Sequence, residues 1–163
     1  MTSSIEALQG VVNAYQALPN VLTGGQPNPD HFRALKEAGV VVILDIRDPM
    51  EPRGFDQQAL MEELGFEYIV IVVSDFTMTD ETLDQIRSVM QQSEDKEVLV
   101  HCQSGNRVGG ALIPYLMLDR GFTEDDATTA ALRMGLRGAG LLEWGASYAR
   151  SRATPPPDER DPK

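Results

Sequence analysis

Several residue types that would indicate a particular class of protein are scarce in this sequence of 163 residues. It contains one cysteine and two histidines. A single cysteine excludes an intramolecular disulfide, as is usual in a reducing compartment. One of the two histidines, His31, lies in a predicted helix without other metal-ligating residues beside it, which argues against a metal site. We therefore expect no disulfide, no metal and no cofactor.

Positively charged residues are also few compared with negatively charged ones. Lys and Arg together number 14 against 25 Asp and Glu, which gives a formal net charge of −11. Nucleic acids and anionic membranes would be repelled by such a surface, so we expect neither as a partner. A small anionic or phosphorylated substrate is compatible with this charge, because one local positive pocket can oppose the overall field. The sequence does not indicate an oligomeric state.

Long apolar runs are missing. No stretch approaches the roughly 18 to 20 apolar residues that a membrane helix needs, and residues 1–20 lack the basic start and apolar run of a signal peptide. We therefore expect a cytoplasmic protein. With 42% hydrophobic residues, we expect one globular domain over residues 1–150. Residues 151–163 are Pro-rich and charged, which predicts a disordered tail.

Strand and helix signals alternate along this domain. Continuous apolar, β-branched runs predict buried strands at 40–46, 68–73 and 97–102, after a short strand at 20–25. Helical patterns lie between and after them, at 28–39, 55–65, 79–90, 105–121 and 123–136. This alternation predicts an α/β fold with three α/β/α layers and a mostly parallel central sheet. The loops 24–27, 45–49, 74–80 and 101–107 should then meet at the carboxyl edge of the sheet, where ligands bind.

The loop HCQSGNR (101–107) carries the lone cysteine and has the composition of an anion site. Its backbone amides, from Gln103 to Asn106, can form a nest at a helix N-terminus, with Ser104 and Gly105 between them. Gly105 can adopt a positive φ angle, and Arg107 can donate to two oxygens of a bound oxyanion. The same field favours the thiolate of Cys102, which makes it a candidate nucleophile. A cysteine that only packs in a core would have no use for glycine and arginine at these positions.

Two segments of the sequence resemble a known family of proteins. VLVHCQSGNRVGG (98–110) resembles the active-site signature of the cysteine-dependent protein phosphatases of the tyrosine and dual-specificity type. Residues 21–48 resemble the N-terminal half of a bacterial branch of that superfamily, described as β-lactamase-hydrolase-like or as the phosphatase domain fused to NAD kinase. The similarity covers residues 18–120 and implies the protein tyrosine phosphatase-like fold.

The resemblance also implies roles for individual residues. Cys102 would attack phosphorus to form a phosphocysteine, and the loop backbone with Arg107 would hold the phosphate oxygens. His101 would favour the thiolate from behind the loop, and Arg47 would brace the site. An upstream aspartate would protonate the leaving group and later activate water, and Asp75 is the candidate. A merely solvated Asp75 stays open as an alternative.

A second candidate acid, Asp80, has a competing interpretation as a charge in the first turn of a helix beside Thr79.

Two departures from the phosphatase pattern keep other functions open. Only four residues separate Cys102 from Arg107, whereas the phosphatase signature has five. Four is the spacing of the rhodanese family, whose smaller ring holds a persulfide. In addition, Val108 stands where phosphatases usually carry Ser or Thr. The sequence predicts a cysteine-dependent phosphoester hydrolase, with a sulfurtransferase carrying a persulfide on Cys102 as the alternative. A non-catalytic anion-binding module is the second alternative.

Two further arginines, Arg133 and Arg137, are one helical turn apart. They could face the same cleft as the cysteine loop. We interpret them instead as part of a solvated helix face.

Overall fold

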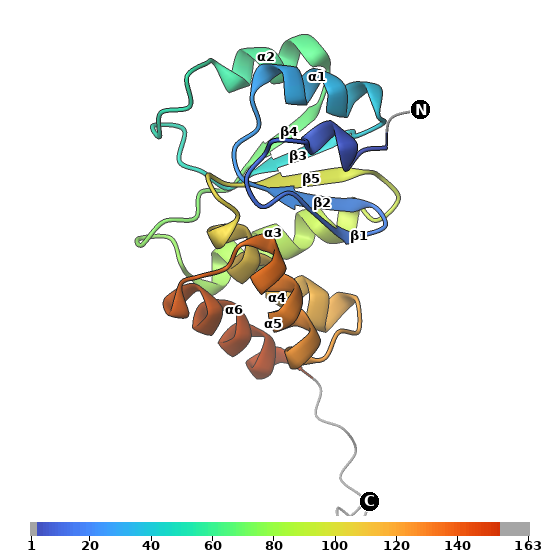
Figure 1. Cartoon of the computed structure of the whole chain (residues 1–163). Coiled ribbons are helices and arrows are strands. Elements are labelled where there is room, and N and C mark those ends of the chain that lie inside the picture. The colour runs from blue at the N-terminus through green and yellow to red at the C-terminus, as the bar shows by residue number, and fades with distance from the viewer. Residues whose placement is uncertain (1–2, 154–163) are drawn as a thin grey trace, which may run out of the picture.

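In the computed structural model, which describes residues 3–153, a five-stranded sheet runs through the middle of the molecule (Figure 1). Its strand order is β1-β2-β5-β3-β4, and β1 alone is antiparallel to its neighbour. The strands are β1 (Tyr15–Leu18), β2 (Val21–Gly24), β3 (Val42–Asp45), β4 (Glu67–Val70) and β5 (Val98–His101).

Helices cover both faces of this sheet (Figure 1). A 3-10 turn (Glu6–Leu8), α1 (Pro29–Glu37) and α2 (Gln57–Leu64) lie on one face. The other face carries α3 (Asp80–Gln92), α4 (Asn106–Asp119), α5 (Glu124–Met134) and α6 (Ala139–Arg152). Each helical layer packs on the sheet through its own hydrophobic cluster. The three-layer α/β/α fold with a mostly parallel sheet is therefore confirmed.

The local signals in the sequence explain where these elements lie. Every residue of β3 and β5 is buried, as expected of central strands covered on both faces. Four of the helices begin at a side-chain cap: Asn28, Asp56, Thr79 and Thr123 accept hydrogen bonds from backbone amides of α1, α2, α3 and α5, respectively. Pro29 occupies the first position of α1, where its missing N–H costs nothing.

The last helix continues to Arg152, two residues past the domain boundary that we predicted at 150. Arg152 is held there by Asp80, at 3.3 Å, and by stacking on the ring of Tyr148. The remainder of the predicted tail, from residue 154, lies outside the described residues. None of the helices between residues 3 and 153 is both long and apolar enough to cross a membrane.

Backbone hydrogen bonds join the loops that leave the carboxyl ends of the parallel strands. The amide of Gln26, after β2, donates to the carbonyl of Gln103, after β5, at 3.0 Å. The amide of Ile46, after β3, donates to the carbonyl of His101, and the amide of Val73, after β4, donates to Ile46. Loops that are far apart in the sequence thus lie side by side at one edge of the sheet, as the topology predicted.

Candidate active site

Cys102 lies at the centre of this edge, directly after β5, and is 1% exposed. The chain turns from β5 into α4 within four residues, and the amide of Gly105 donates a hydrogen bond to the sulfur of Cys102 at 3.0 Å. No acceptor between residues 3 and 153 pairs with the amides of Gln103, Ser104, Asn106 or Arg107. The loop therefore combines a buried thiol with several unpaired donors at a helix N-terminus, where an anion would be stabilised.

Glycine is required at two positions around this loop. Gly105 has a φ angle of +92°, in the left-handed region, and a Cβ there would overlap the carbonyl oxygen of Met134. A Cβ on Gly25 would overlap the carbonyl oxygen of Gln103. The loop is therefore packed against neighbouring backbone on two sides, which fixes its shape.

Arg107 closes the loop and is held by a carboxylate from another part of the chain. Its two terminal nitrogens each donate to Glu51 at 2.9 Å, and one also donates to the carbonyl of Val73 at 3.4 Å. Glu51 accepts two more hydrogen bonds, from Arg47 at 3.1 Å and from the amide of Asp48 at 2.8 Å.

These contacts fix the charges of both partners. The hydrogen bonds from Arg107 are the main reason that the pKa of Glu51 falls to about 2. The hydrogen bond to Glu51 in turn raises the pKa of Arg107 above its ordinary value. Glu51 was not among the predicted site residues, because its role depends on a contact with Arg107, which is far away in the sequence.

His101 lies behind the loop, fully buried, and its hydrogen bonds define its protonation. The side-chain oxygen of Gln57 accepts from Arg53 at 2.8 Å, so the Gln57 nitrogen must face the Nε2 atom of His101, at 2.9 Å. Nε2 is then the acceptor, and Nδ1–H donates to the carbonyl of Cys102 at 3.2 Å. Burial lowers the pKa of His101, which agrees with a neutral ring. His101 thus supports the loop through a backbone hydrogen bond rather than through a positive charge.

Asp45, at the end of β3, anchors the buried polar groups beneath the loop. It accepts hydrogen bonds from Arg53, from Tyr68 and from the amide of Arg47. Burial is the largest effect on the pKa of Asp45 and acts to raise it, but the nearby ring of His101 and these hydrogen bonds together lower it, so the pKa lies below its ordinary value. An ionised Asp45 in turn holds Arg53 in the position from which it orients Gln57.

Arg47 is 3% exposed, and within residues 3–153 its hydrogen bonds go to residues outside the cysteine loop. Its guanidinium donates to Gln26 at 2.8 Å and to Glu51, and each of these partners contacts the loop. Gln26 does so through its amide, which donates to Gln103, and Glu51 through Arg107. The structure thus connects Arg47 to both ends of the loop.

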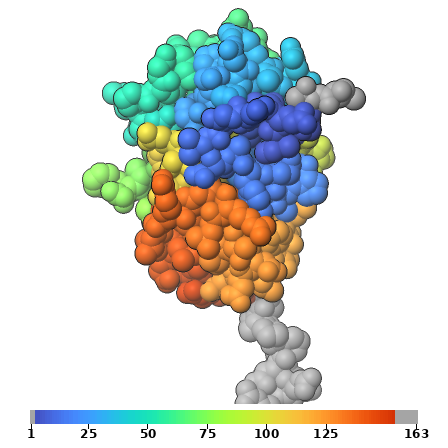
Figure 2. All heavy atoms as spheres, in the orientation of Figure 1, coloured from blue at the N-terminus to red at the C-terminus, as the bar shows by residue number. Residues whose placement is uncertain are grey.

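Asp75 lies in the exposed turn after β4, which begins beside Arg107. The carbonyl that contacts Arg107 belongs to Val73, two residues before Asp75. Figure 2 shows this segment, in light green, projecting from the surface next to the yellow segment that contains Cys102. The other end of the turn is fixed by Trp144 of α6, whose ring nitrogen donates to the carbonyl of Thr79 at 3.2 Å.

The second candidate acid, Asp80, lies in the first turn of α3 and pairs with Arg152 at 3.3 Å. This position agrees with its interpretation as a charge at the N-terminus of a helix.

The connection between α5 and α6 packs against the outer side of the cysteine loop. The side-chain oxygen of Asn106 accepts hydrogen bonds from the amides of Arg137 and Gly138, at 2.7 and 3.1 Å. Asn13 donates to the carbonyl of Ser104 at 2.7 Å. The side chain of Asn106 therefore has a structural role, while its backbone amide, which we expected at a bound anion, has no hydrogen-bond partner among residues 3–153.

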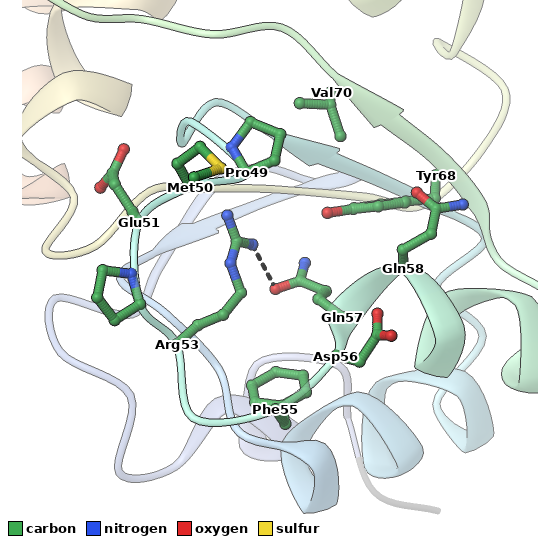
Figure 3. A pocket seen from close by; sticks show the side chains of 11 residues that line it. Pro49, Met50, Glu51, Arg53, Phe55, Asp56, Gln57, Gln58, Tyr68 and Val70 are labelled. Carbon is green, nitrogen blue, oxygen red and sulfur yellow. Dashed lines mark hydrogen bonds between the residues drawn. The ribbon is translucent and has the colours of Figure 1, made fainter.

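A pocket of about 440 Å³ lies beside this site, between the loop after β3 and the edge strand β4 (Figure 3). Arg53 and Gln57 line it and are hydrogen-bonded to each other, and Glu51 lies at its border (Figure 3). Cys102 is not among its lining residues. Within residues 3–153, no cluster of three or more His, Cys, Asp or Glu side chains could hold a metal ion.

This geometry agrees with what comparison with known proteins finds. Residues 20–121 match the family described as "Polymorphic toxin system, DSP-PTPase phosphatase". The chain belongs to this family. The matched region includes the cysteine loop, Glu51 and Asp75, and it identifies the chain as a phosphatase of the tyrosine and dual-specificity type.

Solved structures with the same fold include several phosphatases. A protein from Shewanella putrefaciens CN-32, described as "Putative phosphatase (DUF442)", is 25% identical with a TM-score of 0.76, over 91% of this chain and 97% of that one. PTPMT1 in complex with PI(5)P is 18% identical with a TM-score of 0.73, over 85% and 95% of the two chains. TpbA from P. aeruginosa in complex with pTyr is 17% identical with a TM-score of 0.65, over 85% and 83%. No curated protein matches the sequence.

Proposed function

We propose that the protein hydrolyses a small phosphate monoester through a phosphocysteine intermediate on Cys102. The observation that carries this proposal is the environment of the Cys102 sulfur. The sulfur is buried and accepts a hydrogen bond from the amide of Gly105. It belongs to a loop that Arg107 closes and that has four amides without an acceptor among residues 3–153. Membership of a phosphatase family supplies the reaction type.

In the first step, the thiolate of Cys102 attacks phosphorus, and the sulfur–phosphorus bond forms as the bond from phosphorus to the leaving oxygen breaks. The unpaired amides and Arg107 stabilise the charge on the other phosphate oxygens. Glu51 keeps the guanidinium of Arg107 in place, so that less reorganisation is needed when phosphate enters. Asp75, in its acid form, gives a proton to the leaving oxygen.

In the second step, water attacks phosphorus and the sulfur–phosphorus bond breaks. Asp75, now ionised, takes a proton from that water. Inorganic phosphate and the free thiolate of Cys102 are the products, so no other co-reactant is needed. Val108 follows Arg107 in place of a hydroxyl residue, and the amide of Gly105, at 3.0 Å from the sulfur, is the donor that stabilises the departing thiolate.

The substrate class follows from the charge of the loop and from the relatives. PI(5)P and phosphotyrosine, the ligands of PTPMT1 and TpbA in the structures above, both carry a phosphate monoester group. We propose a phosphorylated small molecule or side chain as the substrate.

The spacing of four residues between Cys102 and Arg107 favours a second candidate, a sulfurtransferase that carries a persulfide on Cys102. A ring this short offers fewer amides than the usual phosphatase loop. The third candidate is an anion-binding module without turnover.

Two assays on one preparation separate these functions. We expect purified protein to hydrolyse para-nitrophenyl phosphate, and Cys102→Ser to abolish this activity. Release of thiocyanate from thiosulfate and cyanide, without phosphatase activity, would instead identify a sulfurtransferase. If neither activity is found and inorganic phosphate still binds, the module is favoured.

A further inference from the structure

The guanidinium of Arg137 lies at the rim of the cysteine loop. Its Nη2 atom is 3.4 Å from the hydroxyl oxygen of Ser104, a residue of the loop. The backbone of Arg137 is fixed to the same loop, because its amide donates to the side chain of Asn106 at 2.7 Å. Arg137 comes from the connection between α5 and α6, so a separate part of the chain brings it to this rim.

The backbone before Arg137 packs closely against the cysteine loop. Gly135, two residues before Arg137, has a φ angle of +115°, and a Cβ there would lie 2.6 Å from the side-chain amide nitrogen of Asn13 and 2.9 Å from the carbonyl oxygen of Ser104. On the other side, a Cβ on Gly105 would lie 2.0 Å from the carbonyl oxygen of Met134. The two segments therefore lie in close backbone contact, which places the side chain of Arg137 beside the loop.

Arg137 also differs in charge pairing from the other arginines near the site. Arg47, Arg53 and Arg107 each form an ion pair with a buried or half-buried carboxylate. In the part of the chain that the structure describes, no carboxylate oxygen lies within 4.0 Å of Arg137. The net charge of the chain is −11, so most arginines have an acidic neighbour. Arg137 is exposed beside the cysteine loop without such a neighbour among the described residues, and it is therefore available for an anionic ligand.

We propose that Arg137 binds a second anionic group of the substrate, so that the preferred substrates carry a phosphate or similar dianion beside the phosphate that is hydrolysed. This inference rests on the proposed function. The hydrolysed phosphate occupies the amides of the loop and Arg107, and Arg137 lies outside that set, at Ser104. Its fork of donors suits two oxygens of a neighbouring group. The interpretation of Arg137 as part of a solvated helix face is thereby replaced.

The test compares phenyl phosphate with phenyl phosphates that carry a phosphonate at the ortho, meta or para position. All of these substrates have a phenol as the leaving group. In the three phosphonates, the distance between the phosphonate and the phosphate increases from the ortho to the para position. We expect at least one of the three to be hydrolysed with a higher kcat/KM than phenyl phosphate, mainly through a lower KM. In Arg137→Ala this preference should fall about 10- to 100-fold, as expected for the loss of a charge-assisted contact. Arg137→Lys should keep part of it.

The matched control is Arg33→Ala, which removes one positive charge from an exposed position on α1, on the other face of the sheet. It should keep the preference, because only the general field changes. The proposal is overturned if the wild type prefers none of the three phosphonates. It is also overturned if Arg137→Ala slows all substrates equally, because Arg137 would then act only through Ser104.

A binding measurement separates failure of this proposal from failure of the proposed function. If no phenyl phosphate is hydrolysed, the phosphatase function fails, and calorimetry on Cys102→Ser still decides the role of Arg137. Pyrophosphate should bind more tightly than inorganic phosphate, and the additional substitution Arg137→Ala should remove the difference. Equal affinity for both anions before that substitution would overturn the proposal.

Discussion

Glu51 and Arg107 are 56 residues apart in the sequence, and two hydrogen bonds of 2.9 Å join their side chains. The pairing leaves the carboxylate fully ionised and sets the direction in which the guanidinium points. Because Arg47 and the amide of Asp48 also donate to Glu51, the carboxylate is itself fixed. The loop after β3 thus determines where the last residue of the cysteine loop lies.

Glu51→Gln keeps the shape of this side chain and removes its charge. We expect kcat/KM for para-nitrophenyl phosphate to fall about tenfold or more, because Arg107 loses its fixed orientation. The free energy of unfolding should fall by about 1 to 3 kcal/mol, measured by urea denaturation.

The same variant tests the pKa. The pKa of Glu51 is lowered in the folded state, so its contribution to stability is complete above about pH 4.5 and is lost as the pH falls toward 2. The loss of stability over this range should be smaller in Glu51→Gln than in the wild type. Equal losses would show that the pair does not exist in solution.

Gly105→Ala should disrupt the cysteine loop. Alanine disfavours the φ angle of +92°, and its Cβ would overlap the carbonyl oxygen of Met134. We expect a loss of at least about 3 kcal/mol in the free energy of unfolding. Gly121→Ala is the matched control, since Gly121 also has a positive φ angle, +75°, but open space around it. That control should cost only about 1 to 2 kcal/mol. Equal costs for the two variants would mean that the close contact at Gly105 is absent.

Asp75→Asn tests the general acid. Phenyl phosphate, with its poor leaving group, should lose about 100-fold or more in kcat/KM, because its leaving oxygen needs a proton. Para-nitrophenyl phosphate has a good leaving group and should lose much less. Asp80→Asn is the matched control, since Asp80 pairs with Arg152 and should not change the ratio between the two substrates. A ratio that is unchanged in Asp75→Asn would remove Asp75 from the mechanism.

His101 should make the protein less stable in mild acid. The pKa of His101 is lowered by burial, so in mild acid its side chain binds a proton in the unfolded chain but not in the folded protein. Stability is therefore complete above about pH 6.5 and declines as the pH falls below it, by at most about 1.4 kcal/mol per pH unit. His101→Asn removes this titration and should flatten the dependence between pH 6.5 and 5.5, measured by chemical denaturation. Parallel curves for variant and wild type would mean that the pKa of His101 is the same in the folded and unfolded states, which would contradict the neutral buried ring.

The sequence predicted most of the sheet because central parallel strands are coded by continuous apolar runs, such as those of β3 and β5. It did not predict β1, whose four residues are mostly half-buried and lack an apolar run. It also did not predict α6. The reason is tertiary: Gly145 of α6 lies against the carbonyl oxygen of Gly110 in α4, so a glycine that weakens the helix locally is needed for close packing.

Local sequence patterns also predicted part of the site, whereas contacts between distant residues were not predictable. The cysteine loop is contiguous, so its thiol, glycine and arginine could be recognised together. The roles of Glu51 and Arg137 depend on contacts with residues far away in the sequence, and no local pattern encodes them. The role of Asp75 stays a prediction, because the contact of this segment with Arg107 is made by the carbonyl of Val73, two residues before Asp75.

The central claim is that Cys102 carries the phosphoryl group during turnover. The most direct measurement is rapid acid quenching of the wild-type protein with an aryl phosphate that is radiolabelled in its phosphate, followed by peptide mapping. We predict label on the peptide that contains Cys102, and none in Cys102→Ser. Hydrolysis that proceeds with no labelled peptide, or with label on another residue, would contradict the account.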